Sequence, residues 1–192
     1  MKDQLWYSIV VRDRHGKVIA RERRRSRSFL KQWNQLMFVQ MTSVALAGAD
    51  QIYDINGVLK SATEEARSFR MEAHGSYTGI QCGTGVTPVA IDDYKLEAVI
   101  GNGTAAGQFD YKGMAIIGDV TLVGPQAQFV VTRKPVNNSG GPITVTEIGI
   151  YTSFYVIATQ VYMCAVRDVL VTPLVVPDGG GMIVDYTLAV AA

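Results

Sequence analysis

The last third of the chain alternates large apolar residues with mostly smaller or polar ones, the pattern of strands that bury one face. From Met182 to Val190 every second residue is large and apolar. Further strands are expected at 129–136, 143–151 and 156–169, separated by turns rich in Gly, Pro and Asn. Short strands joined by such turns predict a mainly β protein whose body is an antiparallel, jelly-roll-like β-sandwich.

The alternation changes phase within the second of these strands. Ile143 and Val145 lie on one face of an ideal strand, whereas Ile148 and Ile150 lie on the other. Glu147 would then share the face of Ile143 and point inward. A β-bulge at this glutamate or the threonine before it would restore the phase, because an extra residue moves every later side chain to the opposite face.

The start of the chain predicts a β-hairpin. Residues 5–11 and 17–20 are rich in β-branched and aromatic residues, and the turn at 13–16 between them ends in a glycine. Residues 21–27 contain five arginines and are expected to form a basic linker.

An amphipathic α-helix is expected to follow, from Ser28 to Ala47. Ser28 can cap its first turn, and Gly48 can end its last. The apolar residues recur at i, i+3, i+4 and i+7, which places them on one face of a helix. They are Phe29, Leu30, Trp33, Leu36, Met37, Met41 and Val44.

Charge divides the chain into a basic start and an acidic remainder. Forty-eight per cent of the 192 residues are hydrophobic, enough for a packed core. Residues 1–31 hold ten Lys/Arg against three Asp/Glu, a net +7, whereas the remainder carries a net −6. We expect an N-terminal arm of residues 1–48, made of the basic hairpin and the helix, and a β-sandwich body of residues 49–192. Residues 49–75 are expected to be a long excursion that ends in a strand near 69–73.

The residue types that carry catalysis or bind metals are few and scattered. Neither His15 nor His74 has a second His or Cys at ligand spacing. Cys82 and Cys164 are expected to be free, buried thiols, with a disulfide or a Cys82–His74 nucleophile pair as less favoured alternatives. Residues 83–88 resemble a phosphate-binding loop only superficially, because the glycine spacing is wrong. We therefore expect no catalytic residues, no cofactor and no metal, and a protein that is not an enzyme.

Four segments of the chain resemble a known group of proteins. They are Thr84–Leu96, Val136–Tyr151 with its Glu-Ile-Gly, Arg167–Leu170 with its Arg-Asp-Val-Leu, and Val176–Gly181 with its Pro-Asp-Gly turn. Together they resemble the virion structural proteins of tailed bacteriophages, over about residues 78–192. The resemblance implies β-sandwich subunits that assemble symmetrically on the head, neck or tail.

We therefore expect a non-enzymatic structural subunit of a bacteriophage particle, working as a homo-oligomer and contacting other virion proteins. Nucleic acid is the less favoured partner, because the basic run lacks interleaved aromatic residues. The sequence has neither an apolar signal core nor an apolar run of roughly 18 residues, so we expect a virion protein made in the host cytoplasm rather than a membrane protein. The residues expected to dock a partner are Arg12, Arg14, Arg21, Arg23, Arg24, Arg25, Arg27, Trp33 and Met37.

The alternative function is a carbohydrate- or receptor-binding module of a phage adhesion device. Exposed tyrosines on a β-sandwich suit sugar binding, and Tyr151, Tyr155 and Tyr162 are the candidates. The period-two pattern around them instead favours burial in the core. Their exposure in the folded protein therefore bears directly on this alternative.

Overall fold

The structure of the chain is a computed structural model. It describes residues 2–26, 28–42, 46, 51–61, 77–112, 116–156 and 159–191. Over these ranges the protein is mainly β and contains one helix. The elements are β1 (Lys2–Arg12), β2 (Val18–Ser26), α1 (Lys31–Thr42), β3 (Ile52–Tyr53), β4 (Leu59–Lys60), β5 (Gly79–Gly83), β6 (Ile116–Ile117), β7 (Thr121–Val123), β8 (Gln126–Arg133), β9 (Ile143–Val156), β10 (Thr159–Val176) and β11 (Gly181–Ala191).

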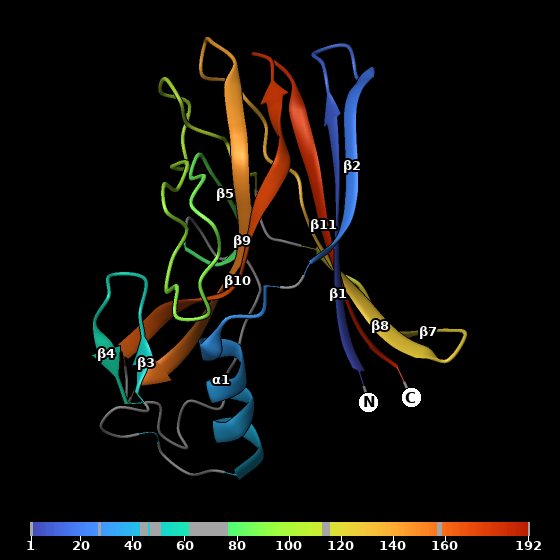
Figure 1. The fold of residues 1–192 in the computed structure, drawn as a ribbon. Coiled ribbons are helices and arrows are strands. Elements are labelled where there is room, and N and C mark those ends of the chain that lie inside the picture. The colour runs from blue at the N-terminus through green and yellow to red at the C-terminus, as the bar shows by residue number, and fades with distance from the viewer. Residues whose placement is uncertain are drawn as a thin grey trace.

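Two antiparallel sheets pack against each other as a sandwich (Figure 1). The larger sheet has the order β2-β1-β11-β8-β6, with β7 also paired to β8, and the smaller has the order β10-β9-β5. One hydrophobic cluster joins them and includes Ile9 and Val184 from the larger sheet and Ile148 and Ile150 from the smaller. The predicted fold class, an antiparallel β-sandwich with an N-terminal hairpin and one helix, is therefore confirmed.

The N-terminal hairpin is part of the larger sheet. Strand β1 pairs with β11 along its whole length, from Lys2 opposite Ala191 to Arg12 opposite Gly181, so the two chain ends lie side by side (Figure 1). The expected division into an arm and a body at residue 48 therefore does not hold for the hairpin. The physical reason is that the backbone groups of β1 pair with the edge of β11 that β8 leaves free, which makes the hairpin part of the sheet.

The basic stretch that was expected to be a linker is a strand. Strand β2 continues to Ser26 and pairs with β1, with Arg23 opposite Ser8. Backbone hydrogen bonds hold a strand whatever its side chains, so arginines are accommodated at a sheet edge where they reach water. Charges on an edge strand also discourage pairing with a further chain.

Helix α1 begins at Lys31, three residues after the expected start at Ser28. Phe29, two residues before its start, forms a β-bridge with Val166 of β10. This long-range contact keeps the chain extended past the expected cap at Ser28. Outside the described residues lie the expected stop at Gly48, the expected strand near 69–73 and His74.

Strand β9 is irregular where the sequence predicts a change of phase. Residues 170–173 of β10 lie opposite the single β9 residue between Val145 and Glu147. The position is as expected, but the extra residues belong to the partner strand. Ile148 lies in the core together with Ile143 and Val145, whereas Glu147 faces the 84–98 loop, which buries it from the other side of the sheet.

Strand β11 confirms the predicted alternation. The side chains from Met182 to Leu188 are buried at every second position, and the residues between them are only partly covered. Val190, the last of the series, is 43 % exposed. It is exposed because it lies at the border of a groove beside the sheet.

Candidate functional site

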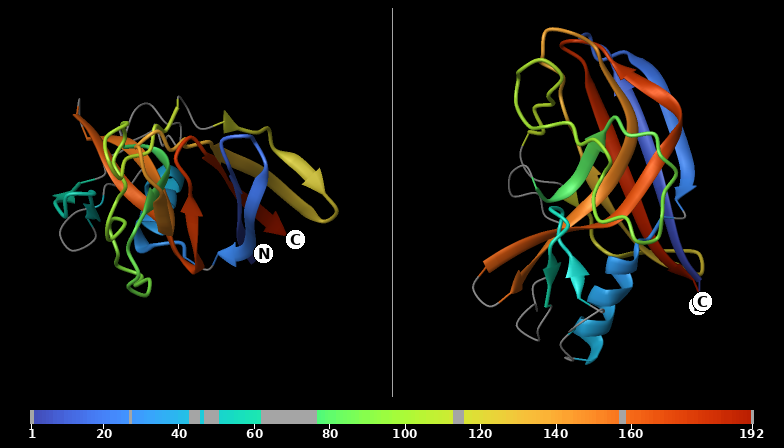
Figure 2. Two further views of the ribbon diagram at one scale, coloured as in Figure 1. Left: turned by 90° about the horizontal axis from the view of Figure 1, so that it is seen from above. Right: turned by 60° about the vertical axis from the view of Figure 1, so that its left-hand side comes forward.

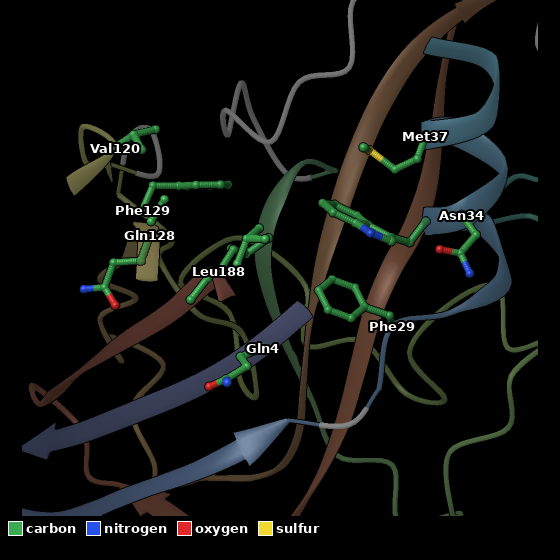
Figure 3. Close-up of a pocket in the computed structure, with 12 residues that line it drawn as sticks. Gln4, Phe29, Asn34, Met37, Val120, Gln128, Phe129 and Leu188 are labelled. Atoms are coloured by element: carbon green, nitrogen blue, oxygen red, sulfur yellow. The ribbon is translucent and has the colours of Figure 1, made fainter. Parts of the chain in front are cut away.

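A groove opens between helix α1 and the end of the larger sheet where the two chain ends meet (Figure 3). Its volume is about 520 Å³. Helix α1 forms one wall, and strands β8 and β11 form the other. Charge is absent from the described residues that line it, which are Gln4, Phe29, Trp33, Asn34, Met37, Val120, Ala127, Gln128, Phe129, Leu188, Ala189 and Val190.

Regular secondary structure positions the apolar side chains of the groove. Trp33 and Met37 lie one turn apart on α1 and therefore share a face of the helix. The ring of Phe29 packs on Trp33, with 4.9 Å between the ring centroids. On the opposite wall, Phe129 and Leu188 are paired neighbours of β8 and β11. The groove is thus preformed by the fold.

An exposed apolar hairpin borders the groove. Residues 120–129, here called the apolar hairpin, comprise β7, the turn and the first part of β8, and they project beyond the rest of the sheet (Figures 1 and 2). Val120 is 71 %, Leu122 82 % and Val123 53 % exposed. Val120 also lines the groove, so the two features form one apolar surface. Contiguous exposed apolar surface of this kind marks sites of contact with another protein, a membrane or a ligand.

The residues expected to dock a partner divide into two groups. Trp33 and Met37 line the groove. The described arginines do not line the groove: Arg12 and Arg14 lie at the β1–β2 turn, at the opposite end of the molecule from α1 (Figure 1), and β2 runs from that turn back to Ser26, opposite Leu5 of β1. Their positions are Arg12 at the end of β1, Arg14 in the turn, Arg21, Arg23, Arg24 and Arg25 on β2, and Arg27 outside the described residues.

The arginines of β2 have different surroundings. Arg24 Nε donates to Glu22 Oε1 at 2.9 Å. The Arg23 guanidinium lies over the Trp6 ring, 5.8 Å from its centroid. Of the residues expected to dock a partner, Trp33 and Met37 therefore line the groove, whereas the described arginines lie outside its lining.

A buried ion-pair cluster centred on Arg167 is the second candidate feature. The side chains of Arg167 on β10 and Glu147 on β9 are 2 % and 0 % exposed. Arg167 Nε donates to Glu147 Oε2 at 3.0 Å, and its Nη1 donates to Asp93 Oδ2 at 2.7 Å. Its Nη2 donates to the Thr87 carbonyl at 3.1 Å. One guanidinium thus ties two strands to the 84–98 loop.

Glu147 binds the same loop through backbone groups. Its Oε1 accepts hydrogen bonds from the N–H of Gly85 at 3.0 Å and of Ala98 at 2.8 Å, and its Oε2 accepts one from the N–H of Glu97 at 3.1 Å. A Cβ at Gly85 would lie only 2.6 Å from Glu147 Oε1, so glycine permits the close approach. With the bond from Arg167, each carboxylate oxygen of Glu147 accepts two hydrogen bonds. A buried carboxylate bonded in this way holds the loop in place.

The segments behind the phage resemblance meet in this cluster. Asp93 belongs to Thr84–Leu96, Glu147 to the Glu-Ile-Gly strand, and Arg167 to the Arg-Asp-Val-Leu run. Sequence reasoning missed the cluster, although a glutamate at an inward position of an apolar strand was its signal. The partners are separated from each other by 20 and 74 residues, and no local pattern relates them.

Asp168, beside the cluster, joins the segment before α1 to both sheets. It accepts hydrogen bonds from Tyr186 Oη and from Ser28 Oγ, each at 2.9 Å. Burial raises the pKa of Asp168, and the hydrogen bonds from the surrounding hydroxyls offset only part of this rise. The Ser28 hydroxyl therefore binds Asp168 between the two sheets and does not form the helix cap that the sequence predicts.

The two cysteines are free and buried, as predicted. Burial raises the pKa of Cys82 to about 12 and also raises the pKa of Cys164. Both thiols are therefore protonated at neutral pH, unlike the thiolates of reactive cysteines. The alternative of a Cys82–His74 pair involves a histidine outside the described residues, and His15 lies exposed in the β1–β2 turn.

The candidate sugar-binding tyrosines have different exposures. Tyr151 is buried, and its hydroxyl accepts a hydrogen bond from the Leu96 N–H at 2.8 Å. Tyr155 and Tyr162 are half-buried. The Tyr162 ring packs at a tilt against the exposed Tyr77, with 5.4 Å between centroids. Burial in the core is thus confirmed for Tyr151 alone.

No protein-family model, no curated protein and no solved structure matches this chain. Among the described residues, the helix is too short and too polar to cross a membrane. Within those same ranges, no three side chains of His, Cys, Asp or Glu gather in a way that could hold a metal ion. The groove, the apolar hairpin and the ion-pair cluster are the features that bear on function.

Proposed function

We propose that the protein is a non-enzymatic structural subunit of a tailed bacteriophage particle, and that it assembles through protein–protein contacts at the groove. The observation that carries the proposal is the continuous uncharged surface formed by the groove and the apolar hairpin. Removing a charge from water costs free energy. A partner that covers this surface does not incur that cost, because none of the described residues of the surface is charged.

Covering this surface contributes favourably to assembly. Burying a large aliphatic side chain contributes roughly 1.5–3 kcal/mol. Val120, Leu122 and Val123 are each more than half exposed, and Trp33 and Met37 add to the same patch. Part of this gain is offset by the loss of translational and rotational freedom, so repeated copies in a symmetric particle strengthen the attachment.

The ion-pair cluster supports a structural role for the body of the protein. The Arg167 guanidinium binds the carboxylates of Glu147 and Asp93. Glu147 also accepts hydrogen bonds from backbone N–H groups of the 84–98 loop. Such fully satisfied polar networks hold a loop in one arrangement. The resemblance to virion proteins involves these same segments, which is consistent with a shared scaffold and not with shared chemistry.

Mass spectrometry of purified phage particles from the producing host tests the proposal. We expect the chain to co-purify with the particles in a fixed ratio to the major capsid protein. A low ratio would place it at the neck or tail, and a high ratio on the head. Particles that lack the chain while the infected cells contain it would refute the proposal.

The alternative, a carbohydrate-binding module, is favoured by one observation, the surface pair formed by Tyr77 and Tyr162. Two adjacent aromatic rings can pack on a sugar face. Glycan-array binding that is lost in Tyr77→Ala but kept in Tyr53→Ala, a substitution of another exposed tyrosine, would favour this alternative. The absence of any glycan binding would remove it.

A further inference from the structure

We infer that the groove of one copy receives the apolar hairpin of a second copy, and that the exchange is reciprocal about a two-fold axis. The inference rests on the proposed assembly role of the groove and names its occupant. It concerns Trp33, Met37 and Phe29 on the receiving side and Leu122 on the inserting side.

The apolar hairpin presents one apolar face. Leu122 pairs across the hairpin with Ala127, so the two side chains lie on the same face. Val120, two residues before Leu122, lies on that face as well, since side chains alternate along an extended chain. Val120 and Ala127 both line the groove. The exposed Leu122 therefore extends the apolar wall of the groove outward, away from the helix.

The hairpin cannot cover its own groove. It is the outer continuation of the wall formed by β8 and β11 and projects away from α1 (Figures 1 and 3). Leu122 consequently remains 82 % exposed in a single copy. Val120 and Ala127 form part of the wall of their own groove, whereas Leu122 is not among the residues that line it, so the outer part of the hairpin can fill a groove only in a second molecule.

A two-fold axis satisfies both sites at once. In an isologous interface the same patch of each subunit contacts the other, so each hairpin lies in the other groove and no site is left open. A head-to-tail contact would leave one groove and one hairpin exposed at the ends of every chain of subunits. Closure of both sites favours the dimer.

Charge favours a second copy as the occupant. The chain has a net charge of +1, so two copies repel each other little. Between residues 117 and 128 the only charged residue is Asp119, and the described lining of the groove has none. A strongly charged partner would gain nothing from such a surface, whereas the hairpin of a second copy matches its polarity.

Sedimentation and light scattering of the purified full chain test the inference. We expect a species of about twice the 20.9 kDa chain mass, which dissociates on dilution. Leu122→Asp should shift the protein to the monomer, because it places a charge inside the partner's groove. Val171→Asp is the matched control: Val171 is 67 % exposed on β10, outside the groove and the hairpin, and its substitution should leave the dimer intact.

Cross-linking identifies the contact directly. Leu122→Cys in one preparation and Asn34→Cys in another place thiols on the inserting face and at the groove. The native thiols are buried and should not compete. Mixing the two variants under mild oxidation should yield a disulfide-linked pair, whereas Leu122→Cys mixed with Val171→Cys should not.

Three results would overturn the inference: a wild-type monomer throughout the tested concentration range, a dimer unaffected by Leu122→Asp, or an open oligomer in place of a closed dimer. Particle analysis separates this inference from the proposed function. A monomeric chain that is nevertheless a stoichiometric part of the particle refutes the hairpin exchange and leaves the structural role standing. A dimer that is absent from particles refutes the phage role and retains the exchange.

Discussion

Replacement of Glu147 by Gln should destabilise the protein severely. Glu147 accepts hydrogen bonds at one oxygen from Gly85 and Ala98, and at the other from Glu97 and Arg167. The glutamine oxygen can keep one of these pairs, but its NH₂ group then faces two donors. Each lost hydrogen bond to a charged group costs about 1.5–3 kcal/mol. Removing one partner of a buried ion pair costs about 3–5 kcal/mol, so the two estimates agree.

Urea unfolding at neutral pH, followed by tryptophan fluorescence and circular dichroism, measures this loss. We expect Glu147→Gln to lower the free energy of unfolding by about 3–5 kcal/mol, a large share of the roughly 5–15 kcal/mol typical of a folded domain. Lys112→Gln is the control: it removes the ion pair with Asp110, in which the lysine side chain is 60 % exposed. An exposed pair of this kind contributes at most about 1 kcal/mol.

A double-mutant cycle tests whether Glu147 and Arg167 stabilise the protein through their mutual interaction. Arg167→Met should be as damaging as Glu147→Gln, but the double variant should be less destabilised than the sum, because no unpaired charge is left opposite position 147. Additive effects would show that the two side chains do not interact. A loss below about 1 kcal/mol in Glu147→Gln would refute the reasoning that this carboxylate is a buried, fully used acceptor.

Three further predictions concern the buried interior. Gly85→Ala should destabilise the protein and loosen the 84–98 loop, measured by urea unfolding and hydrogen exchange, because a Cβ there meets Glu147; wild-type stability would contradict this. Cys82 and Cys164 should react with a thiol reagent only upon unfolding, because both are buried and the pKa of Cys82 is raised to about 12; rapid labelling of the native protein would contradict it. The raised pKa of Asp168 means that its contribution to stability is complete below the unfolded pKa of about 3.9 and is lost as pH rises through the higher folded pKa. Asp168→Asn should therefore gain stability relative to wild type between pH 4 and pH 8 in thermal melts, whereas a constant difference would exclude this linkage.

Local patterns in the sequence determined much of the fold. The alternation from Met182 to Leu188 identified the buried face of β11, and the helical spacing around Trp33 identified α1. The change of phase at Glu147 located the irregular pairing between β9 and β10. Each of these features depends on side chains a few residues apart, and the sequence displays such spacing directly.

The tertiary structure decided which segments lie together. The basic run became a strand because β1 pairs with β11 almost the whole chain length away and with β2 on its other edge. Arg167 pairs with Asp93, which lies 74 residues away in the sequence. The groove is formed by α1 together with β8 and β11. Strand partners and buried charge pairs are selected by packing among all the segments at once, so no periodicity along the chain could specify them. Trp33 and Met37 could thus be read from the sequence as an apolar helix face, but only the position of β11 beside them made that face one wall of a groove.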